Sequence, residues 1–106
     1  MTVENNTYIY LSNGFYFGFI SNGFLYSHNG ICLGWLEGKF VWDLEGKFRG
    51  TIAELGGNKY ILKQRFGLSP ISRPARGPVA SITPASPAPN IKPVNLPVEV
   101  VDAFTS

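Results

Sequence analysis

A 16-residue unit that occurs three times between Asn5 and Ile52 limits the possible fold of this chain more than any other feature. The three copies read NNTYIYLSNGFYFGFI, SNGFLYSHNGICLGWL and EGKFVWDLEGKFRGTI. Each copy holds two short runs of β-branched and aromatic residues separated by a turn signal, which predicts one β-hairpin per unit. A lone hairpin is marginal in water, so we expect the units to bury their apolar faces against one another. The repeated glycines form two columns, which are Gly14, Gly30 and Gly46, and Gly18, Gly34 and Gly50.

The first glycine column marks the hairpin turns. Asn13-Gly14 and the equivalent pair in the second unit predict two-residue type I′ turns, because Asn and Gly both tolerate positive φ. Glu45-Gly46 matches this turn less well and indicates a longer loop. A second break separates successive units, at Asn22-Gly23 and at Glu37-Gly38. These two breaks lie one residue out of register, so we expect the loops between units to differ in type.

The second glycine column falls inside predicted strands, where glycine ordinarily weakens the sheet. At a fixed repeat position, Gly18, Gly34 and Gly50 instead indicate close backbone approach or a sharp bend. We therefore predict an all-β fold of repeated hairpins around a pseudo-symmetry axis. Twelve of the 15 aromatic residues lie between Tyr8 and Phe48, and we expect them to form the core. An aromatic cage for a ligand is the alternative.

The repeat degenerates after Ile52. Residues 59–62 look like the first strand of a displaced fourth unit. Its second strand could come from residues 64–68, from the N-terminus or from the tail of the chain. In the tail, residues 98–101 are the best candidate for an added strand, with Phe104 as its anchor. Terminal units are often atypical because they close or cap the array.

The composition changes after residue 68, because all eight prolines lie between Pro70 and Pro97. Such a stretch cannot form regular helix or central strand and favours polyproline II or open coil. We therefore divide the chain into a β-hairpin repeat domain, residues 1–68, and an extended proline-rich tail, residues 69–106. Apolar side chains recur along the tail, so we expect it to pack on the repeat domain or on a partner subunit.

With three glycine-punctuated hairpins, a weaker fourth unit and a proline-rich tail, the sequence resembles the bacterial four-fold β-flower domain family. The stretch GFLYSHNGICLGWLEGKFVWDLEGKFRG, residues 23–50, carries the resemblance. The resemblance implies four hairpin petals around a pseudo-four-fold axis, with the chain continuing into a proline-rich extension. That family consists largely of proteins without an assigned function, so it implies a fold and little chemistry. Choline-binding wall repeats and MORN repeats look similar, but their periods are longer.

Composition limits the compartment and the partners. A chain of 106 residues allows one domain, and its single cysteine, Cys32, cannot form an internal disulfide. Charged residues make up only 15% of the chain, which leaves sheet edges poorly protected against association and favours a homo-oligomer. Residues 1–10 lack the features of a secretory signal, and no apolar run is long enough to span a membrane. We expect a cytoplasmic protein without membrane contact.

No set of residues predicts catalysis. His28, the only histidine, precedes a turn and is expected on the opposite side of its hairpin from Cys32, which we interpret as an inert buried thiol. Asp43 and Glu45 lie near a turn, where paired carboxylates are usually solvated. One histidine, one cysteine and scattered carboxylates do not supply a zinc-type ligand set. We therefore expect no enzyme activity, no cofactor and no bound metal.

The remaining function classes concern binding. Six basic residues and no acidic ones occur between Lys59 and Lys92, but a solvated basic face explains them, so nucleic acid is disfavoured as a partner. We predict a structural or protein-interaction module that binds itself or another protein. The alternative is an aromatic surface for a carbohydrate or a quaternary ammonium, with Tyr16, Trp35 and Trp42 as the ligand-contacting residues.

Overall fold

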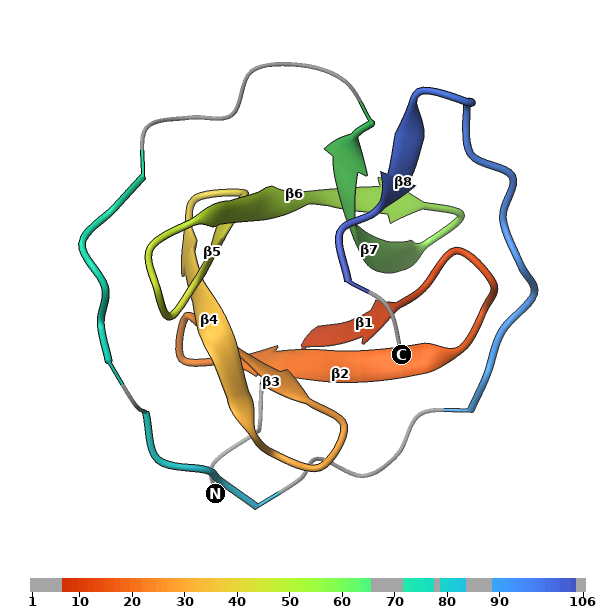
Figure 1. Ribbon diagram of the computed structural model, residues 1–106. Helices are drawn as coiled ribbons and strands as arrows, with labels where there is room; N and C mark the ends of the chain where they lie inside the picture. Colours follow the sequence, from red (N-terminus) through yellow and green to blue (C-terminus); the bar gives the residue numbers. More distant parts are fainter. Residues whose placement is uncertain (1–6, 66–71, 78, 84–88, 105–106) are drawn as a thin grey trace.

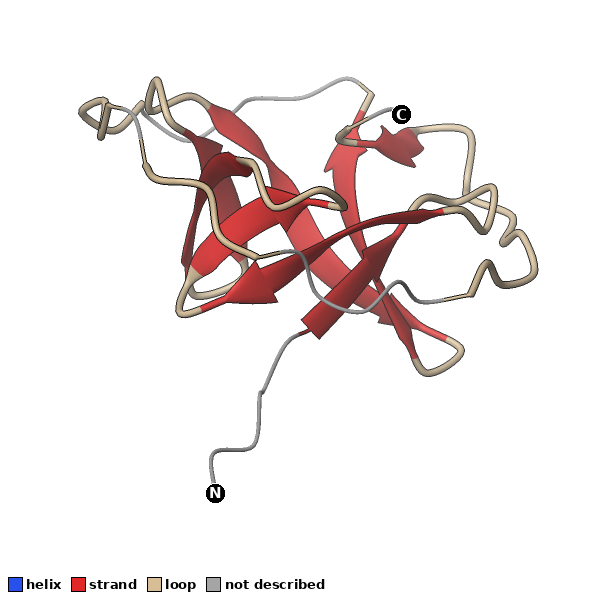
Figure 2. Ribbon diagram, turned by 90° about the horizontal axis from the view of Figure 1, so that it is seen from below, coloured by secondary structure: helices blue, strands red, loops and turns tan. Residues whose placement is uncertain are grey.

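The computed structural model describes residues 7–65, 72–77, 79–83 and 89–104, and within these residues every regular element is a β-strand (Figure 2). The strands are β1 (Thr7–Tyr10), β2 (Tyr16–Ser21), β3 (Phe24–Ser27), β4 (Cys32–Glu37), β5 (Phe40–Asp43), β6 (Phe48–Leu55), β7 (Asn58–Gln64) and β8 (Val100–Asp102). They form one sheet in chain order, and β1 also pairs with β7 in parallel. Seven strands therefore close into a barrel, and β8 pairs with the remaining edge of β7 (Figure 1). The described residues include no helix that could cross a membrane.

The predicted hairpins are confirmed. β1–β2, β3–β4 and β5–β6 are three antiparallel hairpins, which we call petals 1 to 3, and Figure 1 shows them arranged around a centre. Their registers repeat with the sequence, because Ile9 pairs with Gly18, Leu25 with Gly34 and Val41 with Gly50. Each ladder shifts register directly after this pair, which places a β-bulge at the same point of every petal.

The turns at the petal tips correct the prediction of type I′ geometry. In all three petals the glycine N–H donates to the carbonyl three residues earlier, as from Gly14 to Leu11 at 2.8 Å and from Gly46 to Asp43 at 2.9 Å. Only the glycine has positive φ, between 85° and 92°, and the residue before it does not. A type I turn followed by a left-handed glycine needs positive φ at that one position. Glu45 is therefore as suitable as Asn13. The longer loop expected at Glu45-Gly46 is confirmed, because three residues, 44–46, lie between the bonded residues Asp43 and Lys47, and the other two tips have loops of the same length.

The turns between petals do differ in type, as their offset glycines predict. Asn22 and Gly23, with φ of 53° and 80°, form a two-residue turn with both central residues in the left-handed region. Gly38, with φ of 62°, is the first central residue of the next turn, and its second central residue, Lys39, has negative φ. These are the conformations of type I′ and type II′ hairpins respectively.

The glycines inside the strands mark close backbone approach, as predicted. A Cβ atom built on Gly18 would lie 2.1 Å from the Tyr26 carbonyl oxygen, and one built on Gly34 would lie 1.9 Å from that of Trp42. Neither glycine has a left-handed backbone, so the constraint is space alone. The second strand of each petal thus presses against the first strand of the next petal at the glycine.

The expected aromatic core is confirmed in large part, since Trp35, Trp42 and Tyr60 are the largest fully buried side chains, but the cluster at its centre is mainly aliphatic. Four residues at equivalent positions, each at most 3% exposed, belong to the main hydrophobic cluster, and they are Ile9, Leu25, Val41 and Ile61. Side chains alternate between the two faces of a strand. The neighbouring aromatic residues therefore gather on the opposite face, where Phe19 and Tyr26 stack at 5.4 Å and Val79 of the tail packs on their cluster.

The fourth petal is a split hairpin whose second strand comes from the tail, one of the three predicted sources. β7 pairs with β8, and the Ala103 N–H donates to the Ile61 carbonyl at 3.0 Å. Ala103 therefore takes the place that a glycine holds in the other petals. Phe104 is the predicted anchor, because its ring stacks on Phe17 at 5.3 Å and carries the Arg49 guanidinium 4.3 Å above it.

The two strands of this petal are joined by residues 65–99, and the described parts of this connection run around the outside of the other three petals (Figure 1). They contact petal 3, then petal 2 and then petal 1 before β8 returns to β7. The tail thus circles the barrel in the direction opposite to the chain order of the petals.

Candidate functional site

The most regular contact of the molecule lies where the tail crosses the petal tips. Arg73 donates its backbone N–H to the Gly46 carbonyl at 2.7 Å, Ile82 to Gly30 at 3.0 Å and Ile91 to Gly14 at 2.8 Å. The donors are nine residues apart in the tail, and the acceptors are 16 residues apart in the repeat. We call the three tip turns, residues 11–15, 27–31 and 43–47, together with the tail residues bonded to them, the rim.

A second set of hydrogen bonds follows three residues after the first. Arg76 donates its N–H to the Leu44 carbonyl at 3.0 Å, and Val94 donates to Ser12 at 2.8 Å. A polyproline II helix has three residues per turn, so residues three apart lie on one face. Arg73 and Arg76 therefore turn the same face of the tail toward petal 3, and Ile91 and Val94 do so toward petal 1. In the sequence the three donors to the tip glycines, Arg73, Ile82 and Ile91, follow one another at a nine-residue spacing.

The tip glycines serve the tail as well as the turn. A Cβ atom on Gly46 would lie 1.8 Å from the Arg73 carbonyl oxygen, and one on Gly14 would lie 2.0 Å from that of Ile91. Gly14 and Gly46 are therefore needed twice, for positive φ and for the close approach of a second chain segment.

Substitution of Gly46 by alanine is expected to release the tail from petal 3. The Cβ atom would meet the Arg73 carbonyl, and the left-handed backbone at φ of 88° would add about 1–2 kcal/mol of strain. Hydrogen exchange should accelerate at the amides of Arg73 and Arg76, and the midpoint of thermal unfolding should fall.

The matched control is Gly38→Ala. Gly38 also has positive φ, at 62°, but nothing lies within 4 Å of the position that its Cβ atom would take. The control should lose similar stability while the two tail amides stay protected. Equal protection of those amides in both variants would contradict the role assigned to Gly46.

Two of the three predicted ligand-contacting aromatics lie together beneath the tail. Trp35 and Trp42 are a cross-strand pair of β4 and β5, and they are 2% and 0% exposed. The Arg76 guanidinium lies 4.4 Å above the Trp35 ring, and the Arg73 guanidinium lies 4.9 Å above the Trp42 ring. Any other ligand of these indoles would first have to displace the tail.

Glu37 completes this site, although it was not among the residues predicted to carry chemistry. Its carboxylate accepts from the Trp35 Nε1–H at 3.1 Å and from the Arg73 Nε–H at 3.2 Å. The indole hydrogen bond, followed by the bond and the charge of Arg73, holds the pKa of Glu37 below its usual range. Its signal in the sequence is a departure from the repeat, since the equivalent residues are Ser21 and Ala53.

Tyr16, the third predicted aromatic, lies apart from the two tryptophans. Its ring meets Tyr8 at 5.6 Å and Tyr10 at 6.1 Å, edge to face in both cases. The Tyr16 hydroxyl is buried and has no hydrogen-bond partner among the described residues. Desolvation, with smaller contributions from Tyr8 and Tyr10, raises the pKa of Tyr16 to about 12.

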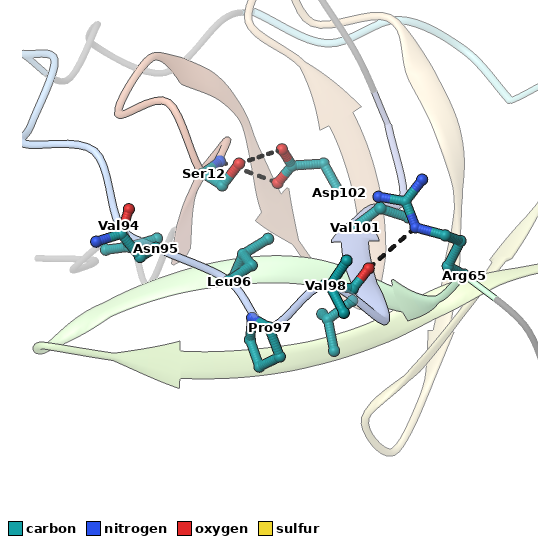
Figure 3. A pocket seen from close by; sticks show the side chains of 10 residues that line it. Ser12, Arg65, Val94, Asn95, Leu96, Pro97, Val98, Val101 and Asp102 are labelled. Carbon is teal, nitrogen blue, oxygen red and sulfur yellow. Dashed lines mark hydrogen bonds between the residues drawn. The ribbon is translucent and has the colours of Figure 1, made fainter.

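A pocket of about 310 Å³ lies between petal 1 and the split fourth petal (Figure 3). Asp102 accepts from the Ser12 N–H at 2.9 Å and from the Ser12 hydroxyl at 2.6 Å, so the polar groups of one wall are bonded to each other. On the other side Arg65 donates its Nε–H to the Val98 carbonyl at 3.0 Å. The first pair of bonds ties β8 to the tip turn of petal 1, and the last bond ties the residue after β7 to the tail just before β8.

The residues weighed for catalysis are separated. His28 is exposed in the tip turn of petal 2, and Cys32 is buried, where burial raises the pKa of its thiol. Asp43 is not simply solvated as predicted, because its carboxylate accepts from the N–H groups of Glu45 and Lys47 at 3.0 Å. Asp43 therefore shapes the tip turn of petal 3. The described residues include no cluster of three or more metal-ligating side chains.

The described basic residues of the second half of the chain have different contacts. Lys59 lies 3.6 Å from Glu54, Arg73 and Arg76 cover the tryptophans, and Arg65 donates to a backbone carbonyl.

Comparison with known families gives one result that bears on the whole fold. The sequence model of a family described as "4-fold beta flower protein" matches residues 1–100. No curated protein and no solved structure matches the chain. The matched region includes strands β1 to β7, the tail and the first residue of β8.

Proposed function

Since the chain belongs to the 4-fold beta flower protein family, we propose that it is a non-enzymatic protein-interaction module that holds extended, proline-rich segments along its rim. Its own tail is the occupant in the present structure. The family membership supplies the small β fold, and the proposal concerns what the rim of that fold is for.

The observation that carries the proposal is the set of three N–H donations from Arg73, Ile82 and Ile91 to three equivalent tip glycines. The petal side of each contact is a backbone carbonyl, which can accept from any residue except proline. Prolines are free to occupy the positions between the donors, and they reduce the entropy lost when the segment is ordered. The rim thus suits a proline-rich segment with a donor every ninth residue.

The bound segment can come from the same chain, from a second copy or from another protein. A segment on the same chain has an effective concentration in the millimolar range, so it occupies the rim first. Binding to other molecules therefore requires that the tail be loosened or outcompeted.

The double variant Ile82→Pro, Ile91→Pro tests the proposal, because proline removes the two N–H donors and leaves every petal residue unchanged. A fluorescent peptide with the sequence of residues 79–94 is titrated into the full-length variant and followed by anisotropy. The variant should bind the peptide, whereas the wild type, whose rim is occupied, should bind it weakly or not at all. Light scattering at rising protein concentration shows whether a second copy supplies the segment instead.

The matched control is Ser81→Pro, Lys92→Pro, which adds two prolines to the tail beside the donors. This control should behave like the wild type. A peptide that itself carries proline at positions 82 and 91 should not bind the variant. The proposal fails if the folded Ile82→Pro, Ile91→Pro variant binds neither the peptide nor a second copy.

A second candidate function is binding of a quaternary ammonium by Trp35 and Trp42. It is favoured by the two guanidinium cations that already lie over these rings, at 4.4 and 4.9 Å. Choline titrated into the Arg73→Ala, Arg76→Ala variant should quench tryptophan fluorescence if this function is correct. An unchanged spectrum would remove it.

A further inference from the structure

The face of the β4–β5 strand pair that lies beneath Arg73 and Arg76, which we call the groove, differs from the equivalent faces of the repeat. Its cross-strand pair is Trp35 with Trp42, and Glu37 lies at its end. On the neighbouring faces the corresponding residues are Phe19, Tyr26 and Ser21, and Thr51, Leu62 and Ala53. Over β2 and β3 the tail packs through the apolar side chain of Val79, so a cover of this kind does not require the carboxylate and two indoles found here.

The groups of this groove complement a guanidinium. Glu37 accepts from Arg73 Nε–H at 3.2 Å while its hydrogen bond with the Trp35 indole, at 3.1 Å, keeps the carboxylate in place. The face of Trp42 receives the Arg73 guanidinium, and the face of Trp35 receives that of Arg76. A planar cation thus meets a π-face and a charged acceptor at once, a combination that Arg satisfies better than Lys.

The indoles of the groove are buried, whereas the ion pair between Glu37 and Arg73 is open to solvent. Both indoles are buried on paired strands, whereas the Arg73 and Glu37 side chains are 47% and 38% exposed. An arginine can therefore leave or enter without any opening of the core. The two arginines are three residues apart on either side of Pro74 and Ala75, and this spacing places them on one face of a polyproline II segment.

We propose that this groove is a recognition site for paired arginines, so that the rim selects proline-rich segments of the form Arg-Pro-x-Arg from a partner protein. The inference rests on the proposed function, because it names the segments that the rim accepts. The tail of this chain presents one such segment to its own groove, and a partner segment must bind more tightly than the tail does in order to replace it.

The test uses the full-length Arg73→Ala, Arg76→Ala variant, in which the groove has lost both guanidinium groups. Labelled peptides with the sequence of residues 70–80 carry arginine, lysine or citrulline at positions 73 and 76. The arginine peptide should bind at least about tenfold more tightly than the citrulline peptide, which keeps the shape and loses the charge. The lysine peptide should fall between them.

Addition of Glu37→Gln to the same variant should remove most of the preference for arginine over citrulline. Glu45→Gln is the matched control, because Glu45 is a rim carboxylate that is 77% exposed and lies on the tip turn of petal 3. It should leave the preference unchanged.

The outcomes separate the two proposals. Equal binding of all three peptides would overturn the arginine site and leave the interaction module standing. The arginine site would also be overturned, with the interaction module left standing, if the 79–94 peptide binds the Ile82→Pro, Ile91→Pro variant and no 70–80 peptide binds the Arg73→Ala, Arg76→Ala variant. Should the Arg73→Ala, Arg76→Ala variant not fold, the proton NMR signal of the Arg73 Nε–H in the wild type decides. A chemical shift displaced by the Trp42 ring current, with loss of the signal in Glu37→Gln, supports the site. A chemical shift typical of solvated arginine overturns it.

Discussion

Gly34→Ala is expected to unfold the protein. The new Cβ atom would lie 1.9 Å from the carbonyl oxygen and 2.9 Å from the carbonyl carbon of Trp42, and these backbone atoms belong to a paired strand that cannot turn away. The overlap can be relieved only by separating petal 2 from petal 3. We expect a loss of more than about 4 kcal/mol, a large part of the roughly 5–15 kcal/mol that stabilises a typical domain. Circular dichroism and denaturant unfolding measure it.

A graded series distinguishes this steric effect from ordinary loss of glycine. Gly18→Ala, with 2.1 Å to the Tyr26 carbonyl, should be nearly as damaging, whereas Gly50→Ala, with 2.7 Å to that of Leu62, should be milder. Gly23→Ala is the control, since its Cβ would meet nothing within 4 Å and only its positive φ is affected. Equal stability of the Gly34→Ala and Gly23→Ala variants would disprove the close approach.

The second large effect is loss of stability in alkali through Tyr16. Burial raises its pKa from 10.0 to about 12, so the unfolded chain releases the phenolic proton before the folded chain does. The stabilising contribution is complete below pH 10 and disappears as the pH rises from 10 to about 12. This rise of the Tyr16 pKa corresponds to a loss of about 2 kcal/mol in the free energy of unfolding, after allowance for partial exposure of the ring. Free energies of unfolding at pH 8 and pH 11 measure the loss.

Tyr16→Phe removes the contribution of Tyr16 to this sensitivity, while Tyr26 and Tyr60, whose pKa values burial also raises, keep theirs. At neutral pH the substitution should be neutral or slightly stabilising, because the Tyr16 hydroxyl is buried without a partner among the described residues. At pH 11 the variant should be more stable than the wild type. Tyr8→Phe, in the same tyrosine cluster, is the control and should retain the alkaline loss. A Tyr16→Phe variant with the wild-type pH profile would contradict the assignment.

The architecture could be predicted because it follows from periodic local signals. The three hairpins, the close approach at Gly18 and Gly34 and the strand supplied by the tail all agree with expectations drawn from the residues. The turn type at the petal tips was wrong because an Asn-Gly pair fits two geometries. Only the third unit, with Glu45 before the glycine, carries the information that one positive φ is sufficient.

The site was harder to predict because its two halves lie far apart in the chain. Trp35 and Trp42 were singled out as aromatics, but nothing local to them specifies that Arg73 and Arg76 cover their faces. That contact follows from the path of the tail. The path brings donors nine residues apart in the tail to acceptors 16 residues apart in the repeat, a relation that the sequence shows only once the petals are known.

The split fourth petal has a consequence for the order in which the protein is made. Synthesis completes β7 well before β8, so the half of the β7 edge formed by Leu62, Lys63 and Gln64 stays unpaired while the intervening tail is translated. Bare sheet edges invite pairing with neighbouring nascent chains, and a charged residue at the edge discourages it. Lys63 lies in the middle of this edge, where its charge disfavours such pairing until the ribosome has added the last strand.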